Sequence, residues 1–311
     1  MNDRDLCRDA IRAGSRSFHA ASLLLPRRVR REALALYAFC RMSDDMVDDP
    51  ERTGSAADRL ALRLDDVYRG RPADHFADRE FTRVVELRSI PRAIPDALVE
   101  GFRWDEDGRR YATIGELHGY GARVASTVGV MMTLIMGRRE RAVLARAADL
   151  GLAMQLTNIA RDVGEDARNG RIYLPLDWLA EAGVDPQAFL AKSEAQPGVR
   201  ATTRRLLAEA ARLYDRADTG VRALPASCRP AIAAASLIYR DIGRVVAAAE
   251  HDSVTRRART SAGRKIALVG RATARALLPT GAVAEGPTED AARFLVGAAL
   301  PQNASPGNRS R

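Results

Sequence analysis

Apolar residues recur at three- and four-residue steps along nearly the whole chain, and no run of alternating β-branched residues interrupts them. This period is typical of amphipathic helices and predicts an all-α protein. Pro26 stands where a helix often begins, and Thr113 and Glu116 have the spacing of a capping box. The pattern predicts helices near residues 3–13, 27–49, 55–70, 95–106, 114–137, 139–167, 202–224, 228–250 and 260–278.

The 311 residues are enough for one large core, and no fixed-period repeat or linker divides them. We therefore expect a single domain over residues 1–278. From about Pro279 the sequence turns to Gly, Pro, Ala, Asn and Ser, a composition that cannot bury much apolar surface. Residues 279–311 are predicted to be a disordered tail.

The charge of the chain comes almost entirely from arginine. Lys and Arg number 49 against 40 Asp and Glu, which gives a net charge of +9, yet Lys192 and Lys265 are the only lysines. Arginine carries planar donors that suit phosphate and carboxylate. The composition therefore favours an anionic partner and leaves nucleic acid, acidic lipid and a phosphorylated small molecule open.

Cysteine usage and the N-terminal sequence indicate a cytoplasmic setting. Cys7, Cys40 and Cys228 are far apart and odd in number, so neither a disulfide framework nor a zinc site is indicated. The first residues lack the apolar core of a signal peptide, and the longest uncharged apolar stretch, 124–137, is too short to span a bilayer. We expect a soluble protein or one that sits on a membrane face.

Two predicted helices carry acidic stripes, each embedded in apolar sequence. Their members follow steps of three or four residues, so each set shares one helix face. The first stripe consists of Tyr37, Arg41, Asp44 and Asp48, and the second consists of Gln155, Asn158, Asp162 and Asp166.

Carboxylates four residues apart on a helix repel each other unless a cation neutralises them. The donors are all oxygen atoms, which favours Mg²⁺ over zinc, with Mn²⁺ as an alternative ion. Two such helices across a cavity would hold a diphosphate through bridging metals, with Arg41 and Arg161 adding direct charge. A single stripe could equally be a solvated face, but two favour the metal site. Asp45 and Asp49 lie off the stripes.

The segment 124–137 combines small residues with pliable ones. Ala125, Gly129 and Thr133 recur every four residues, and three methionines, Met131, Met132 and Met136, lie among them. The stripe is consistent with close helix packing and with the wall of a long apolar lane. Three aromatic residues, Phe18, Tyr37 and Tyr239, are candidates to face a carbocation or to lie in the core.

These motifs together resemble the squalene/phytoene synthase family, most closely its bacterial phytoene synthases. The resemblance rests on the first stripe, on the second stripe together with Arg161 and Glu165 within it, and on the segment from Arg171 to Pro175. It extends over roughly residues 15–278. It implies the family's single-domain isoprenoid-synthase bundle with a central active-site cavity.

The resemblance implies head-to-head condensation of two geranylgeranyl diphosphates in carotenoid biosynthesis. One substrate loses diphosphate, and the double bond of the other attacks the allylic cation to form prephytoene diphosphate. A second ionisation, rearrangement and proton loss give phytoene. This activity is that of a Mg²⁺-dependent prenyltransferase that needs no NADPH.

Site residues follow from the same resemblance. The expected metal ligands are Asp44, Asp48, Asn158, Asp162 and Asp166. The expected substrate-binding residues are Ser15, Arg16, Ser17, Phe18, Tyr37, Arg41, Gln155, Arg161, Tyr239, Arg256 and Lys265. Of these two sets, Tyr37, Arg41, Arg161 and the four aspartates are expected to be catalytic.

One departure from the family pattern lies in residues 120–126, where Ala122 replaces the second tyrosine of a Y-C-Y-x-V-A-G segment. The role of that hydroxyl would fall to Tyr120 or to a water. The alternative activity is dehydrosqualene, squalene or presqualene diphosphate synthesis from farnesyl diphosphate. An arginine-rich nucleic-acid-binding module is a remote alternative, because it gives no reason for the acidic stripes. We expect a polyprenyl diphosphate substrate, peripheral contact with lipid at the inner face of the membrane, downstream carotenoid enzymes as partners, and no nucleic acid.

Overall fold

The computed structural model describes residues 2–49, 54–276, 283, 286 and 288–300, without the side chains of Arg16, Asp48 and Ala276. Helices account for nearly all of the regular structure in these ranges, and no strand occurs within them. The elements are α1 (Asp3–Gly14), α2 (Arg16–Ser22), α3 (Arg27–Asp48), α4 (Ala56–Tyr68), α5 (Phe76–Arg88), α6 (Ala93–Glu106), α7 (Ile114–Gly121), η1 (Ala122–Ser126), α8 (Thr127–Ile135), α9 (Arg141–Arg168), α10 (Leu176–Glu181), α11 (Pro186–Lys192), α12 (Pro197–Val221), α13 (Arg229–Ala248), α14 (Ala262–Ala276), η2 (Asp290–Ala292) and α15 (Arg293–Ala299).

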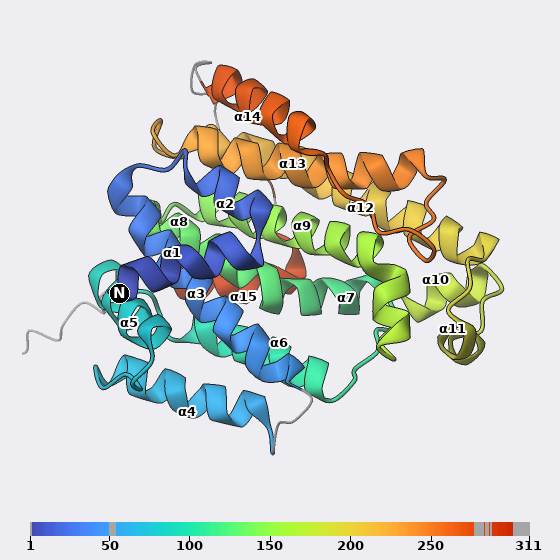
Figure 1. Cartoon of the computed structure of the whole chain (residues 1–311), viewed down its shortest axis with the longest axis horizontal. Coiled ribbons are helices and arrows are strands. Elements are labelled where there is room, and N and C mark those ends of the chain that lie inside the picture. Colours follow the sequence, from blue (N-terminus) through green and yellow to red (C-terminus); the bar gives the residue numbers. More distant parts are fainter. Residues whose placement is uncertain (1, 50–53, 277–282, 284–285, 287, 301–311) are drawn as a thin grey trace, which may run out of the picture.

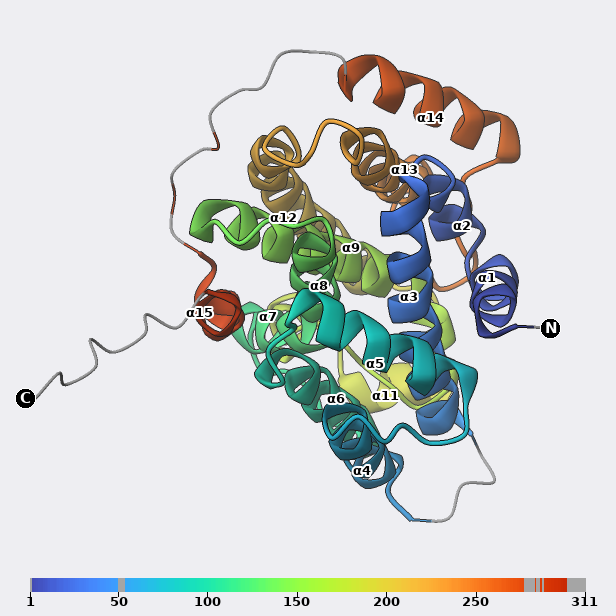
Figure 2. The same ribbon diagram turned by 90° about the vertical axis from the view of Figure 1, so that its left-hand side faces the viewer.

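Helix α9 runs through the middle of the bundle (Figure 1). It packs against α12 and α13 on one side and against η1 and α8 on another. Helices α4, α5 and α6 form the lower tier in Figure 2, and α14 lies outermost, where it packs on α13. The helices around α9 therefore enclose the space in which the candidate site lies.

The predicted all-α class is confirmed, and each predicted helix has a counterpart. The segment expected to be one helix over 114–137 is divided, because its turns widen to a π-helix over η1. Helix α12 begins earlier than predicted, at Pro197, whose fixed φ suits the first turn. Five short or medium helices were not predicted: α2, α5, α10, α11 and α15.

Side-chain caps begin several of these helices. The Ser15 hydroxyl accepts from the Phe18 amide at 3.2 Å and starts α2. The Thr113 hydroxyl accepts from the Glu116 amide at 3.3 Å, as the capping box predicts. The Glu116 carboxylate reaches one residue further back than expected and accepts from the Ala112 amide at 2.9 Å. Each cap satisfies a backbone donor that the first helical turn leaves unpaired.

The prediction of a disordered tail is wrong for residues 288–300. Two apolar residues of α15, Leu295 and Val296, are fully buried, and the helix packs against α6, α8 and α9. The run Phe294, Leu295, Val296 and Ala299 supplies a helical apolar face that composition averaged over the whole tail conceals. The remaining tail positions, 279–282, 284, 285, 287 and 301–311, lie outside the described residues.

No helix in the described ranges combines the length and the hydropathy needed to cross a bilayer.

Candidate active site

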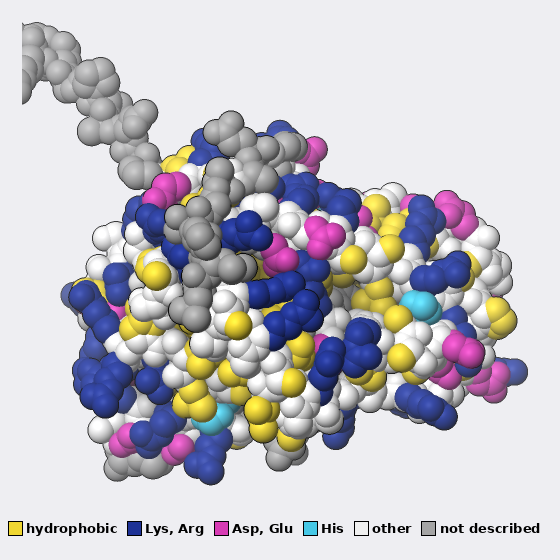
Figure 3. Space-filling model, turned by 90° about the horizontal axis from the view of Figure 1, so that it is seen from above, with side chains coloured by type: hydrophobic (Ala, Val, Ile, Leu, Met, Phe, Trp, Pro, Cys, Tyr) yellow, Lys and Arg dark blue, Asp and Glu magenta, His cyan; other side chains and the backbone are white. Residues whose placement is uncertain are grey.

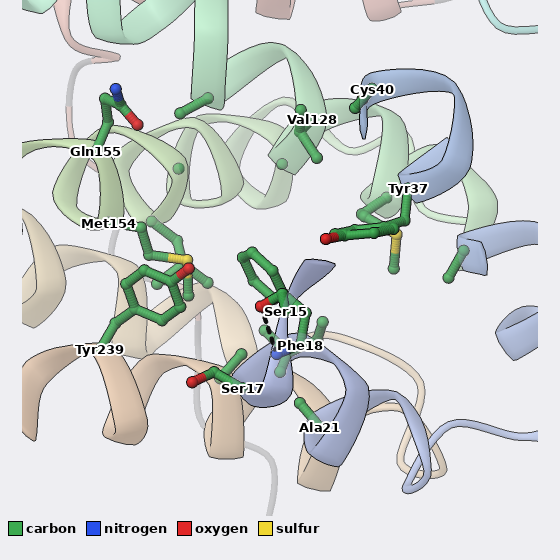
Figure 4. A pocket seen from close by; sticks show the side chains of 18 of the residues that line it. Ser15, Ser17, Phe18, Ala21, Tyr37, Cys40, Val128, Met154, Gln155 and Tyr239 are labelled. Atoms are coloured by element: carbon green, nitrogen blue, oxygen red, sulfur yellow. Dashed lines mark hydrogen bonds between the residues drawn. The ribbon is translucent and has the colours of Figure 1, made fainter. Parts of the chain in front are cut away.

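A cavity of about 810 Å³ lies between α2, α3, α8, α9, α12 and α13. Figure 4 shows part of its wall, with α2 and Tyr239 on one side and Tyr37, Val128 and Gln155 on the other. The structure brings eleven of the predicted site residues to this wall: Ser15, Ser17, Phe18, Tyr37, Arg41, Asp44, Gln155, Asn158, Arg161, Tyr239 and Lys265. The side chains of Arg16 and Asp48 lie outside the described part of the chain.

The three candidate aromatic residues form one cluster at the cavity. The Phe18 ring lies 5.3 Å from the Tyr239 ring and 6.4 Å from the Tyr37 ring, measured between centroids. Burial raises the pKa of Tyr37 and that of Tyr239 to about 12. Both phenols are therefore neutral at physiological pH, and their rings present an electron-rich surface to the cavity.

Helix α3 carries the first stripe to the cavity. Asp44 and Arg41 both line the wall, and Arg41 also pairs with Asp45, which lies off the stripe as expected. Arg41 keeps 47% of its side-chain surface exposed. A half-exposed guanidinium at a cavity wall can donate charge-assisted hydrogen bonds to an anion.

Helix α9 carries the second stripe, and its members divide between two surfaces. Gln155, Asn158 and Arg161 line the cavity. Asp162 and Asp166 are not part of its wall. The Asp162 carboxylate accepts from the Arg161 guanidinium, with 2.8 Å between Nε and Oδ1. The sequence pattern therefore identified one helix face, while the structure shows that its last turns leave the cavity.

An arginine that the sequence analysis missed completes this region. Arg257 lines the cavity and donates from Nε to Asp162 Oδ1 at 2.8 Å, and its Nη1 lies 2.9 Å from Glu165 Oε2. Arg256, the predicted residue, is exposed and does not belong to the wall. Arg256, Arg257 and Arg259 stand close together in an irregular segment, so no helical period could distinguish them.

Asp166 is held among other acids. Burial and, to a smaller extent, the nearby charges of Asp162 and Glu165 together raise its pKa to about 7, against the opposing charge of Arg171. The carboxyl is thus partly protonated near neutral pH. A cation placed among these oxygens would favour the charged form.

The oxygen donors on α9 fit a hard divalent ion in two respects. Asn158 Oδ1 is buried and has no hydrogen-bond partner within the described residues, and burial with two neighbouring acids raises the pKa of Asp166, two turns further on. In the described ranges no three Asp, Glu, His or Cys side chains converge on one point. The donor chemistry therefore fits Mg²⁺, while the complete ligand set stays a prediction.

The segment 124–137 supports both interpretations of its small-residue stripe. Ala125, Gly129 and Thr133 line the cavity together with Met132 and Met136, whereas Met131 is fully buried elsewhere. Gly129 also packs directly on α9, because a Cβ there would lie 2.5 Å from the Ala147 carbonyl oxygen. One face of this helix thus serves close packing and forms the apolar wall.

The structure does not support Tyr120 as a substitute for the missing family tyrosine. Tyr120 is absent from the cavity wall, and its hydroxyl donates to Asp105 Oδ2 at 2.9 Å. Tyr173 donates to the other oxygen of Asp105 at 2.7 Å. Ala122 is fully buried at the start of η1. This tyrosine pair anchors the segment that follows α9 and leaves the cavity without a phenol from α7.

The sequence model of the family described as Squalene/phytoene synthase matches residues 11–264. The chain belongs to this family. It is 52% identical to the phytoene synthase of Rhodobacter capsulatus over 98% of this chain and 92% of that protein. It is 50% identical to the phytoene synthase of Cereibacter sphaeroides, over 96% and 88% of the two chains.

Among solved structures, this chain is similar to a dehydrosqualene synthase in complex with a ligand. The TM-score is 0.79 at 30% identity, over 88% of this chain and 96% of that chain. A squalene synthase from Alicyclobacillus acidocaldarius shares the fold, with a TM-score of 0.72 and 24% identity over 80% and 94% of the two chains. The predicted isoprenoid-synthase bundle and prenyltransferase class are confirmed.

Proposed function

We propose that this protein is a phytoene synthase that condenses two geranylgeranyl diphosphates head to head in carotenoid biosynthesis. The observation that carries the proposal is identity near one half to two phytoene synthases over nearly the full length. These relatives do not favour the alternatives that start from farnesyl diphosphate, and they do not favour a nucleic-acid-binding module.

The polar end of the cavity suits the diphosphate of such a substrate. Arg41, Arg161 and Lys265 offer positive charge from three different elements, and Ser15 and Ser17 offer hydroxyl groups nearby. Guanidinium groups aimed at the leaving oxygen stabilise the charge that develops there as the C1–O bond breaks. Arg257 and Arg259 extend this surface.

We further propose that Mg²⁺, or Mn²⁺ in its place, binds between the two stripes. Asn158, Asp162 and Asp166 on α9 would hold it with Asp44 and Asp48 on α3. When bound, such an ion neutralises the diphosphate and makes it a better leaving group. The Arg161 and Arg257 side chains, which pair with Asp162, would then be released to contact phosphate oxygens directly.

The remainder of the cavity suits a carbocation that must not meet water. Away from the polar end, the cavity wall consists mainly of Leu, Val, Met and Ala side chains, among them Leu25 and Ala235. An apolar lining excludes the water that would quench the cation. The Phe18, Tyr37 and Tyr239 rings could stabilise its charge without supplying a nucleophile. Ionisation needs no general base, and the departing diphosphate, or a water that it holds, is the proposed acceptor of the final proton.

Product analysis tests the function directly. The protein is incubated with Mg²⁺ and either geranylgeranyl or farnesyl diphosphate, without NADPH, and the hydrocarbon is identified. We expect phytoene from the first substrate. Consumption of farnesyl diphosphate alone would refute the phytoene assignment and favour the dehydrosqualene-type alternative.

We also propose that the protein is cytoplasmic and touches the inner face of the membrane, where its hydrocarbon product and downstream carotenoid enzymes would reside. Helix α14 supports this: it carries four Lys or Arg and no acid, and it exposes 73% of Ile266. Figure 3 shows many Lys and Arg side chains on this side. Flotation with anionic vesicles tests the contact, and no co-migration at low salt would contradict it.

A further inference from the structure

The cavity extends far beyond the polar end. Its wall follows one stripe of α9, from Arg161 through Asn158, Gly151 and Ala147 to Val143. These 18 helical steps correspond to roughly 27 Å along the helix axis. A prenyl chain whose diphosphate lies near Arg161 would therefore extend along α9 toward Val143.

The far end contains a buried charge where an apolar tail would end. Arg146 lines the cavity, yet its side chain is only 3% exposed. Its Nε lies 3.0 Å from Asp149 Oδ2, and Arg216 of α12 donates to the same oxygen at 3.2 Å. A guanidinium can border an apolar chain only when it is neutralised in this way.

Close packing fixes the Arg146 side chain from the α12 side. A Cβ at Gly220 would lie 3.0 Å from Arg146 Cγ and closer still to its Cβ, so only glycine allows this approach. Ala217, on the same helix, lines the cavity beside it. The shape of the far end thus depends on where Arg146 is held.

Val283 and Glu289, which follow α14, contact this part of the molecule. Glu289 pairs with Arg216 and accepts from Arg212 Nη2 at 3.0 Å. Val283 packs against the apolar cluster of Met136, Val143 and Leu224 that ends the cavity. The buried helix α15 anchors the segment on the bundle. Val283, Glu289 and α15 all lie beyond the part of the chain that the family model matches, 11–264.

We propose that residues 288–300, which contain Glu289 and α15, set how well the cavity accepts the full length of a geranylgeranyl chain. Glu289 holds Arg216 against Asp149, and Asp149 holds the Arg146 side chain that forms the far wall. Glu289 is thus a positioning residue that touches no substrate. This inference rests on the proposed function, because it concerns the tail of that substrate.

Chain length provides the test. A farnesyl chain is one isoprene unit shorter, so its tail stops before the far wall and does not sense Arg146. We expect E289Q to lower kcat/KM for geranylgeranyl diphosphate about tenfold and to change the value for farnesyl diphosphate less than twofold. R146M, which keeps an unbranched side chain against Gly220, should act in the same direction. The assay measures diphosphate release from each substrate.

The matched control is D290N. Asp290 is the next residue, is 88% exposed and pairs with Arg293 of its own segment, so D290N should leave both values unchanged. Thermal denaturation checks whether each variant is folded. If R146M does not fold, E289Q alone provides the test. An equal loss on both substrates, or no loss in either variant, would overturn the inference. If the unmodified protein used neither substrate, the proposed function itself would fail.

Discussion

The two ends of the cavity both contain charged side chains, but they balance them differently. At the far end, three arginines face three acids in one network: Arg146, Arg212 and Arg216 with Asp149, Glu209 and Glu289. At the polar end, Asn158 Oδ1 has no hydrogen-bond partner within the described residues, and burial with two neighbouring acids raises the pKa of Asp166 to about 7. Of the six far-end charges only Arg146 lines the cavity, so that network supports a wall, whereas at the polar end Arg41, Asp44, Asn158 and Arg161 all line the cavity and can meet a ligand.

Removing acids from the polar end should have the largest effect. We expect D44A and D162A each to lower kcat by 10²–10³ or more, because the charge on the leaving diphosphate would lose its stabilisation. Release of diphosphate from geranylgeranyl diphosphate in Mg²⁺ measures this. The control D215A removes an acid that is 75% exposed on α12 and should be silent. Unchanged turnover in both variants would refute the metal site.

Filling the far end should separate the two substrates. A217L places a larger side chain on α12 where the tail of a geranylgeranyl chain would lie. We expect kcat/KM for that substrate to fall about 10- to 100-fold, while kcat/KM for farnesyl diphosphate stays unchanged. Equal effects on both would mean that the tails do not extend toward Ala217.

The pH dependence of the stability of the metal-free protein should reveal the raised pKa of Asp166. Because the pKa of Asp166 is raised to about 7, its ionisation disfavours the folded state, and stability falls as the pH rises from about 4 to 7. D166N should therefore melt at a higher temperature than the unmodified protein at pH 7.5, with a smaller difference at pH 5. Added Mg²⁺ should stabilise the unmodified protein more than D166N. The opposite order at pH 7.5 would contradict the raised pKa.

The smallest effect concerns the frame of the polar end. S15A removes the cap of α2 and should cost about 1 kcal/mol of unfolding free energy, measured by chemical denaturation. It should also raise KM, since Ser15 lines the cavity. S55A removes the equivalent cap of α4 away from the cavity and should lower stability without changing KM. Equal KM values in the two variants would argue against a role for Ser15 in binding.

The sequence predicted the long helices because their apolar period is uninterrupted. Helix α5 escaped because its buried face includes Asp78 and Glu80, and Asp78 is paired with Arg63 from α4. The π-helix η1 was not predicted because the spacing of apolar side chains does not reveal a widened helical turn. Helix α2 is only seven residues long and is held by one serine cap.

The candidate site was predicted where motif spacing identifies a helix face, as at Asn158 and Arg161. The site could not be predicted where an irregular backbone determines which side chain faces the cavity, as at Arg257. It also could not be predicted where ion-pair partners come from distant segments. The network that joins Arg146 to Glu289 links residues more than 140 positions apart, and no local pattern records it.

The contact between Gly129 and Ala147 has a consequence for how this enzyme can diversify. Gly151 makes the reciprocal contact, since a Cβ there would lie 2.5 Å from the Ala125 carbonyl oxygen. At these two contacts the main chains of η1, α8 and α9 touch, so a side chain at either glycine would force the helices apart. The opposite wall carries alanines such as Ala217, Ala231 and Ala235. Variation in product range should therefore accumulate on α12 and α13, while the glycines across the cavity remain fixed.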